Sequence, residues 1–169
     1  MKEFIKKIKN KEVREATELV VDNLPEYFYK IPASSSGKYH PSFSLGEGGL
    51  YRHVKFATEV ALNLFNIIEF STIEKDIIIS SILLHDGLKQ GLKGTGHTVK
   101  THDDLMAKHL TELWKDDFEG REKIINCVKS HMGQWCTTRK PIGKLEKFVH
   151  TCDYLASRKF YDKYYNIKN

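Results

Sequence analysis

The sequence has few cysteines, and those it has are not paired in the chain. Cys127, Cys136 and Cys152 are the only three among 169 residues, and no Cys-x-x-Cys spacing occurs. An odd number without paired spacing argues against a disulfide-stabilised scaffold, and it gives little support to Cys127 or Cys136 as a metal ligand. We therefore expect free thiols in a reducing compartment.

Long apolar runs are also missing. The most apolar stretch, residues 77–84, reads IIISSILL, whereas a membrane-spanning helix needs about 20 apolar residues. The N-terminal stretch MKEFIKKIKNKEVREA contains no apolar segment of the kind found in signal peptides. These two absences predict a soluble, cytoplasmic protein.

Composition fits one domain of ordinary size. With 40% hydrophobic residues, a chain of 169 residues can bury a full core. We expect residues 1–169 to form a single unit, with an N-terminal helix and loop in 1–49 and a helical core in 50–162. The net charge of +5 favours anionic partners such as nucleotides or nucleic acid, although a solvated basic surface is the more ordinary explanation.

Apolar residues recur at helical spacing along most of the chain, which predicts an all-α bundle of about six main helices. Ser71 and Glu74 have the spacing of a capping box, and Thr101 with Asp104 forms a looser version of it. Gly133 stands where a helix end is expected. The predicted helices span residues 3–22, 50–68, 72–85, 101–115, 119–131 and 144–162. The long loop at 24–49 is expected to form a functional rim, and a flexible glycine-rich loop is expected after Asp86.

The adjacent pair His85-Asp86 follows the most apolar helix directly. A carboxylate at the buried end of such a helix costs several kcal/mol unless a cation compensates it. Imidazole and carboxylate are both ligands of divalent metals, and neighbouring ligands can face one ion where a helix ends. The pair therefore predicts a metal site.

Further candidate ligands lie on inward faces or at helix ends. His53 shares an apolar stripe with Ala57, and Asp153 lies between Val149 and Ala156 on another. A lone histidine in such a stripe is usually a satisfied core residue, and a histidine at a helix end is usually a cap. The remaining candidates, each at a helix end or beside a ligand, are His102, His131 and His150, with His150 placed to support the Asp153 carboxylate.

Several residues could neutralise an anionic substrate. Lys89, three residues after Asp86, could turn back toward the site or remain a solvated lysine, and His40 could contact phosphate or be an ordinary surface histidine. Position alone suggests Arg52, Arg139 and Lys144 as further substrate contacts. The loop 132–143, which carries Trp135, could hold an aromatic, charged substrate or merely cover the core.

The ordered series His53, His85-Asp86, His102, His131 and Asp153 across a helical chain resembles the HD superfamily of metal-dependent phosphohydrolases. The resemblance implies that His53, His85, Asp86 and Asp153 bind one metal, and that His102 and His131 bind a second bridged by Asp86. It also implies a phosphate contact for Lys89. The segment HPSFSLGEGGLYRH is similar to the Gly-Gly-Leu-x-x-His entry into the first ligand helix of HD exonucleases.

This resemblance implies hydrolysis of a phosphomonoester or phosphodiester, in a nucleotide or short oligonucleotide, by metal-activated hydroxide. Asp86 and Lys89 would be catalytic, and Lys89, His40, Arg52, Arg139 and Lys144 would bind substrate. Nitrogen and oxygen ligands suit one or two ions of Mn, Fe, Co, Ni or Zn. Two alternatives stay open: an HD-fold di-iron oxygenase and a non-catalytic nucleotide-binding module.

Overall fold

Helix α4 (Thr72–Leu84) is the centre of the computed structural model, which describes residues 1–165. Every residue from 76 to 84 is buried, and α4 packs against α2 (Lys11–Asp22), α3 (Gly49–Leu64), α6 (Arg121–Ser130) and α7 (Gly143–Ala156). The capping box predicted from Ser71 and Glu74 opens this helix with both of its hydrogen bonds. The end of α4 is therefore fixed at the middle of the bundle.

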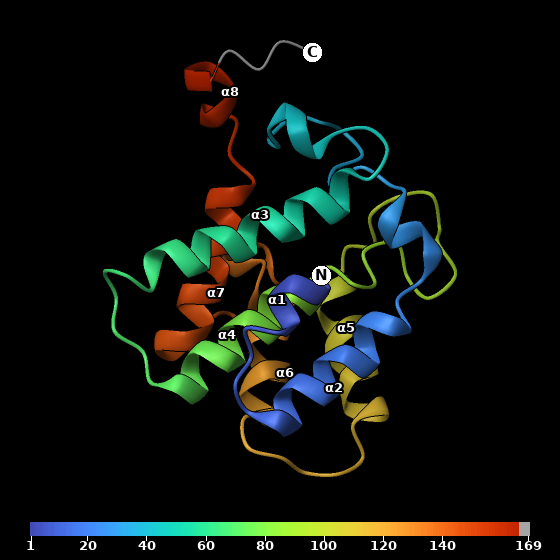
Figure 1. Cartoon of the computed structure of the whole chain (residues 1–169). Coiled ribbons are helices and arrows are strands. Elements are labelled where there is room, and N and C mark those ends of the chain that lie inside the picture. The colour runs from blue at the N-terminus through green and yellow to red at the C-terminus, as the bar shows by residue number, and fades with distance from the viewer. Residues whose placement is uncertain (166–169) are drawn as a thin grey trace.

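The other helices surround α4 and complete an all-α fold, as predicted. Figure 1 shows α3 crossing over α7, and α5 (His102–Leu113) packs against α6. Shorter elements are α1 (Lys2–Ile5), η1 (Glu26–Tyr29), η2 (Ser42–Ser44), η3 (Gly133–Trp135) and α8 (Phe160–Tyr165). Residues 1–165 contain no β-strand, and none of their helices combines the length and apolar character needed to cross a membrane.

The helix predicted at 3–22 is wrong in one respect, because it is interrupted between Ile5 and Lys11. The buried Asp76 carboxylate accepts the backbone N–H groups of Lys9 at 2.9 Å and Asn10 at 2.7 Å. The Asn10 side chain in turn accepts the N–H of residue 13 and caps α2. These bonds hold the intervening residues outside a helix.

The helix predicted at 144–162 is also divided. It ends at Ala156, where the Ser157 hydroxyl donates to the carbonyl of Tyr154 at 2.9 Å and competes with helix continuation. Helix α8 begins at residue 160, and its Asp162 carboxylate accepts both the N–H and the hydroxyl of Ser42. The C-terminal helix is thereby tied to the loop that precedes α3.

Smaller differences from the prediction have local causes. Helix α3 stops at Leu64 rather than 68, and α6 begins at residue 121 because Gly120 has a φ of 93°. The Thr101 cap is wrong, since its side chain makes no capping bond and Asp104 instead accepts the hydroxyl of Thr138 at 2.6 Å. Gly133 does follow α6 with a positive φ of 61°, as predicted.

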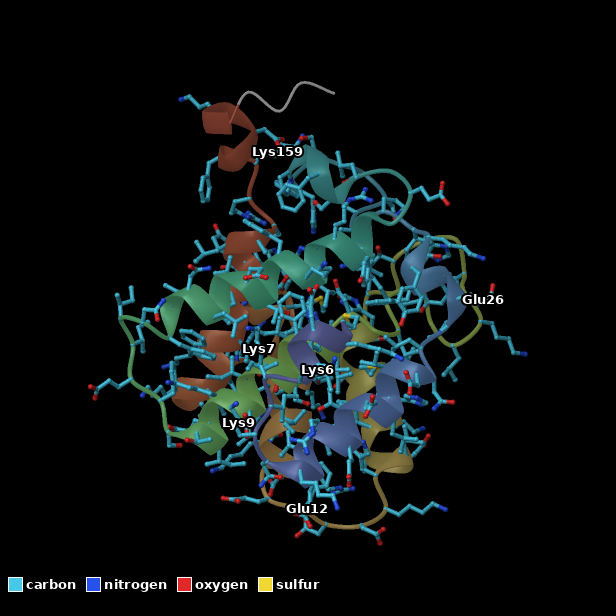
Figure 2. All side chains as sticks on the ribbon, in the orientation of Figure 1. Lys6, Lys7, Lys9, Glu12, Glu26 and Lys159 are labelled. Atoms are coloured by element: carbon cyan, nitrogen blue, oxygen red, sulfur yellow. The ribbon has the colours of Figure 1, made fainter. Side chains whose placement is uncertain are left out.

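Three lysines near the N-terminus are exposed, and the thiols lie inside the bundle. Lys6, Lys7 and Lys9 are exposed along the segment between α1 and α2 (Figure 2). The three cysteines are free and buried, which confirms the prediction of unpaired thiols. Burial raises the pKa of Cys127, Cys136 and Cys152 to about 12, so these thiols stay protonated near neutral pH.

Candidate metal centre

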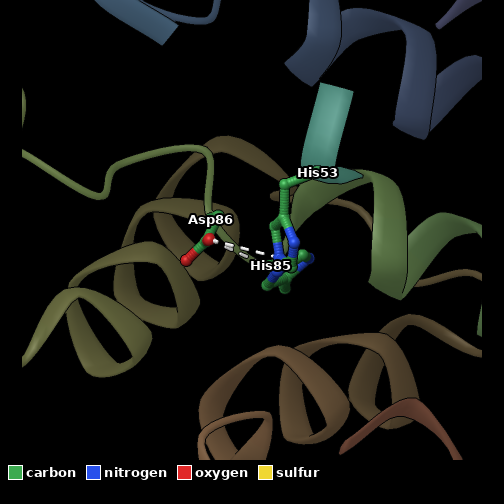
Figure 3. A group of neighbouring side chains, drawn as sticks. All are labelled: His53, His85 and Asp86. Carbon is green, nitrogen blue, oxygen red and sulfur yellow. Dashed lines mark ion pairs between the residues drawn. The ribbon is translucent and has the colours of Figure 1, made fainter. Parts of the chain in front are cut away.

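The five helices α3 to α7 each direct one or two side chains toward a single point in the bundle. His53 lies one turn into α3, and His85 and Asp86 follow the buried end of α4. Figure 3 shows His53 and His85 beside the Asp86 carboxylate. His102 is the first residue of α5, His131 follows α6, and Asp153 lies in α7. The structure thus brings together all the ligand candidates of the H…HD…H…H…D series.

Asp86 faces two groups of imidazoles, one with each oxygen. Its Oδ2 is 3.9 Å from His53 Nε2 and 3.4 Å from His85 Nε2. Its Oδ1 is 3.0 Å from His102 Nε2 and 3.6 Å from His131 Nε2. The two oxygens of one carboxylate can therefore serve two neighbouring positions.

Asp153 completes the first of these groups. Its Oδ1 is 3.0 Å from His53 Nε2 and 3.6 Å from His85 Nε2. Ligand atoms close enough to share an ion form three overlapping sets: His53 with His85 and Asp86, His85 with His131 and Asp153, and Asp86 with His102 and His131. None of these sets, drawn from the residues that the structure describes, includes a cysteine.

Backbone carbonyls fix the orientation of three imidazoles. Nδ1 of His85, His102 and His131 lies 2.7, 2.8 and 2.7 Å, respectively, from the carbonyl oxygen three residues earlier in the chain. A carbonyl can only accept, so each Nδ1 carries a proton and each Nε2 faces the centre. For His102 that carbonyl belongs to Val99, whose N–H donates to the carbonyl of Lys89 at 2.9 Å.

The donor set fits a divalent metal. Among the described residues, the buried atoms without a hydrogen-bond partner include His85 Nε2, His102 Nε2 and Asp86 Oδ1. Two ligands that are each about 2.0–2.2 Å from an ion lie roughly 3.0–3.5 Å apart at tetrahedral or octahedral angles. The separations of 3.0–3.9 Å around Asp86 are close to this range. An ion would satisfy buried atoms that nothing else in the described residues satisfies.

Electrostatics keep the two carboxylates ionised. Burial by itself would raise the pKa of Asp86, but the charges of Lys89 and His85 hold it well below its usual value. Burial acts the same way on Asp153, and hydrogen bonds from His53 and His85 lower its pKa well below the usual value. Burial would lower the pKa of His85, yet Asp86 and Asp153 raise it to about 10 in the metal-free site. A proton on this imidazole thus competes with a metal.

A cavity of about 400 Å³ leads from the ligands to solvent. Lys89 lines it with Nζ 2.5 Å from Asp86 Oδ2, and His40 lines it with its ring 5.3 Å from that of His53. Burial lowers the pKa of His40 to about 3, so this imidazole is neutral near pH 7. The wall consists of Ala33, Ser34, Tyr39, His40, Asp86, Lys89, Thr98, His102, His131, Met132, Trp135, His150, Asp153, Tyr154, Ser157 and Arg158.

Three predicted substrate contacts lie outside this wall. Arg52 donates to backbone carbonyls of the loop 43–47, and Arg139 pairs with Glu146 at 2.7 Å. Lys144 donates to a backbone carbonyl ahead of α4. The acceptors of all three cations lie away from the cavity, so the structure does not bring these residues to it.

Sequence reasoning missed part of the cavity wall. Tyr39, Tyr154 and Arg158 all line the cavity, and only the position of Tyr154, directly after Asp153, could have signalled this. His150 is oriented differently from the expectation, because its Nδ1 lies 2.7 Å from the carbonyl of His131 rather than supporting Asp153.

Comparisons with known proteins find two curated relatives that act on phosphodiesters. A protein of Shouchella clausii named 3'-5' exoribonuclease YhaM is 24% identical over an alignment of 169 positions, which covers 92% of this chain and 51% of that protein. The dihydroneopterin 2',3'-cyclic phosphate phosphodiesterase of Methanocaldococcus jannaschii is 33% identical over an alignment of 122 positions, which covers 66% of this chain and 47% of that enzyme. The chain spans about half the length of these relatives.

No family model and no solved structure matches the chain. The family assignment therefore depends on agreement between separate observations. The ordered H…HD…H…H…D series, the all-helical fold that brings its side chains together, and the two phosphodiester-cleaving relatives all agree. Together these observations support an HD-type domain, the family that the ordered ligand series resembles.

Proposed function

We propose that this chain is a metal-dependent phosphohydrolase that cleaves a phosphomonoester or phosphodiester, probed best with nucleotides and short oligonucleotides. The observation that carries the proposal is the Asp86 carboxylate, which presents one oxygen to His53 and His85 and the other to His102 and His131. The printed names of both relatives, an exoribonuclease and a cyclic phosphate phosphodiesterase, support the same reaction class.

Two adjacent groups of residues would hold the metal. His53, His85, Asp86 and Asp153 form one group, and Asp86 joins His102 and His131 in the other. Divalent ions bound there would supply Lewis acidity, which lowers the pKa of a coordinated water and stabilises charge at phosphorus. Imidazole and carboxylate ligands suit Mn, Fe, Co, Ni or Zn.

Lys89 and His40 line the cavity and suit the binding of a phosphate. Lys89 places a cation at the cavity wall within 2.5 Å of Asp86, where it attracts the ester and can transfer its hydrogen bonds to a phosphate oxygen. His40 stays neutral and can donate or accept a hydrogen bond without repelling the metal. The neutral histidines leave the two carboxylates as the anionic ligands, so the loaded site remains cationic.

The test measures hydrolysis by the metal-loaded protein. Substrates are nitrophenyl phosphate mono- and diesters, 2',3'-cyclic nucleotides, nucleoside monophosphates and short oligonucleotides. We expect Asp86→Ala to lower kcat/KM by about 10³-fold or more and Lys89→Met by about 10²-fold. The matched control is Asp22→Ala, which removes an exposed carboxylate at the end of α2. Equal activity of wild type and Asp86→Ala, or no hydrolysis of any substrate, contradicts the proposal.

Other outcomes would point to the alternatives. If the iron-loaded protein consumes oxygen with an organic substrate and cleaves no ester, the result would support the oxygenase alternative instead of hydrolysis. Tight retention of a nucleotide without turnover would identify a binding module.

A further inference from the structure

The cavity beside the proposed ligands has an aromatic wall, formed by Tyr39, Trp135 and Tyr154. Their side chains are unusually open for large rings, with exposed fractions of 54%, 54% and 39%. The other tryptophan of the chain, Trp114, is buried and donates its indole N–H to a backbone carbonyl of α2. Trp135 is therefore not needed to fill the core.

Two of the three rings of this aromatic wall are nearly parallel. Trp135 and Tyr154 are inclined by only 12°, with ring centroids 6.3 Å apart. The Arg158 guanidinium lies 4.2 Å from the Tyr154 centroid and 5.7 Å from the Tyr39 centroid, so it joins the two tyrosines. Its nitrogens also donate to the hydroxyl of Ser157. A flat aromatic group could stack here without first ordering these side chains.

The aromatic wall is connected to the ligands by short covalent and hydrogen-bonded paths. Tyr154 directly follows Asp153 in α7, and Trp135 lies four residues after His131. His150 bridges the two segments, since its Nδ1 donates to the carbonyl of His131 and its ring is 6.0 Å from Tyr154. A molecule in the cavity can thus reach the metal ligands with one end and the aromatic wall with the other.

The turn that carries Trp135 packs tightly against His150. Gly133 has a φ of 61°, and a Cβ added there would lie 2.2 Å from an atom of the His150 ring. Glycine is therefore required by both the backbone conformation and the close approach. The turn holds Trp135 at a fixed place relative to His131 and His150.

We infer that the aromatic wall is a nucleobase subsite, so that the substrates are phosphate esters carrying a flat heteroaromatic ring beside the phosphate. This inference rests on the proposed function and adds the class of substrate. A cavity of about 400 Å³ is within the usual range for a small-molecule site and has room for a nucleotide. Stacking accepts any base, since every base has a π-face, so we expect little preference among the four bases.

The kinetic test compares ring-bearing and ring-free substrates of the same reaction. Adenosine 2',3'-cyclic phosphate carries the ring, and 1-O-methylribose 2,3-cyclic phosphate lacks it. Trp135→Ala and Tyr154→Ala should raise KM for the first by about 5- to 100-fold and leave KM for the second unchanged. Trp135→Phe keeps a flat ring and should stay close to wild type. The matched control is Ile67→Ala, which shortens an apolar side chain of 78% exposure that does not line the cavity.

A binding test reports on the aromatic wall even if no ester is cleaved. Trp135 is the exposed tryptophan, so adenosine 5'-phosphate should quench the tryptophan fluorescence, and ribose 5-phosphate should not. Tyr154→Ala should shift the half-saturating concentration of adenosine 5'-phosphate upward by about 5- to 100-fold. A short adenine oligonucleotide, run in parallel, distinguishes a free nucleotide from the end of a strand as the natural source of the ring.

The outcomes separate this inference from the proposed function. Asp86-dependent hydrolysis with no change of KM in Trp135→Ala and Tyr154→Ala keeps the phosphohydrolase and overturns the base subsite. If the quenching depends on the ring and Tyr154→Ala weakens it, while no ester is hydrolysed, the base subsite is supported and the proposed hydrolase activity is contradicted. Equal effects of the two variants on ring-bearing and ring-free substrates also overturn the subsite, because they indicate a general disturbance of the cavity.

Discussion

Replacing Gly49 by alanine should destabilise the protein by crowding the entrance to α3. A Cβ at this position would lie 2.2 Å from the carbonyl oxygen of Ser44 and 3.0 Å from the Cα of Pro32. Both are backbone atoms, so no side-chain rotation can make space. The same Ser44 carbonyl accepts the N–H of Ala33 at 3.0 Å, a bond that must lengthen if the loop moves.

The size of the effect follows from opposing contributions. Overpacking costs about 1–3 kcal/mol and a weakened hydrogen bond about 0.5–1.5 kcal/mol, whereas replacing glycine in a helix recovers at most about 1 kcal/mol. We expect a net loss of about 1–3 kcal/mol, which lowers Tm by about 2–12 °C in a chain of this size. Activity should fall as well, since His53 lies one turn into α3 and His40 lies in the displaced loop.

Thermal unfolding followed by circular dichroism measures this loss. The matched control is Gly46→Ala in the same loop, where an added Cβ meets no atom within 4 Å and only the φ of 68° is unfavourable. That variant should lose about 1–2 kcal/mol and keep its activity. A Gly49→Ala protein that melts at or above the wild-type temperature with full activity would refute the reasoning.

Three further outcomes can be measured on the purified protein. Metal content should fall from two ions per chain to one in His102→Ala, because this imidazole faces only the Oδ1 side of Asp86; an unchanged count of one ion would remove the second position. Metal affinity, measured by chelator competition, should rise by up to about tenfold per pH unit between about pH 6 and pH 8. The reason is that the pKa of about 10 keeps His85 protonated until a metal displaces the proton. An affinity that does not change with pH would contradict this. Asp76→Ala should lower the free energy of unfolding in urea by about 2–4 kcal/mol, because two backbone N–H groups lose their acceptor. The exposed Glu12→Ala is its control, and equal losses in both variants would show that these bonds contribute nothing specific.

The sequence was most informative where the determining interactions are local. The apolar run of α4 and the capping box of Ser71 and Glu74 lie within one segment, and the start of this helix was predicted correctly. The break between α1 and α2 could not be predicted, because it depends on Asp76, which is 67 residues from Lys9 in the sequence. Helical periodicity reports which face is buried, but it does not report which distant carboxylate will bind the backbone.

In the candidate site, likewise, the ligands could be predicted from the sequence and the cavity wall could not. Each ligand candidate lies on an apolar face or at a helix end, so packing of the helices was enough to bring them together. The cavity wall depends instead on loops, and the conformation of Tyr39 and Trp135 has no periodic signal. Arg52 was considered because it is one residue from His53, yet neighbours along a helix point in different directions, and its guanidinium binds loop carbonyls.

The backbone of Val99 links two parts of the site that the sequence separates by the glycine-rich loop. Its N–H is bonded to the carbonyl of Lys89, and its carbonyl is bonded to Nδ1 of His102. We therefore expect a displacement of His102 to be transmitted to the backbone of Lys89. If an ion beside His102 changes the affinity of the site for phosphate at Lys89, then bound phosphate would change the affinity for that ion by the same factor. We therefore expect metal loading and phosphate binding to be coupled, with the backbone of Val99 as the structural link between His102 and Lys89.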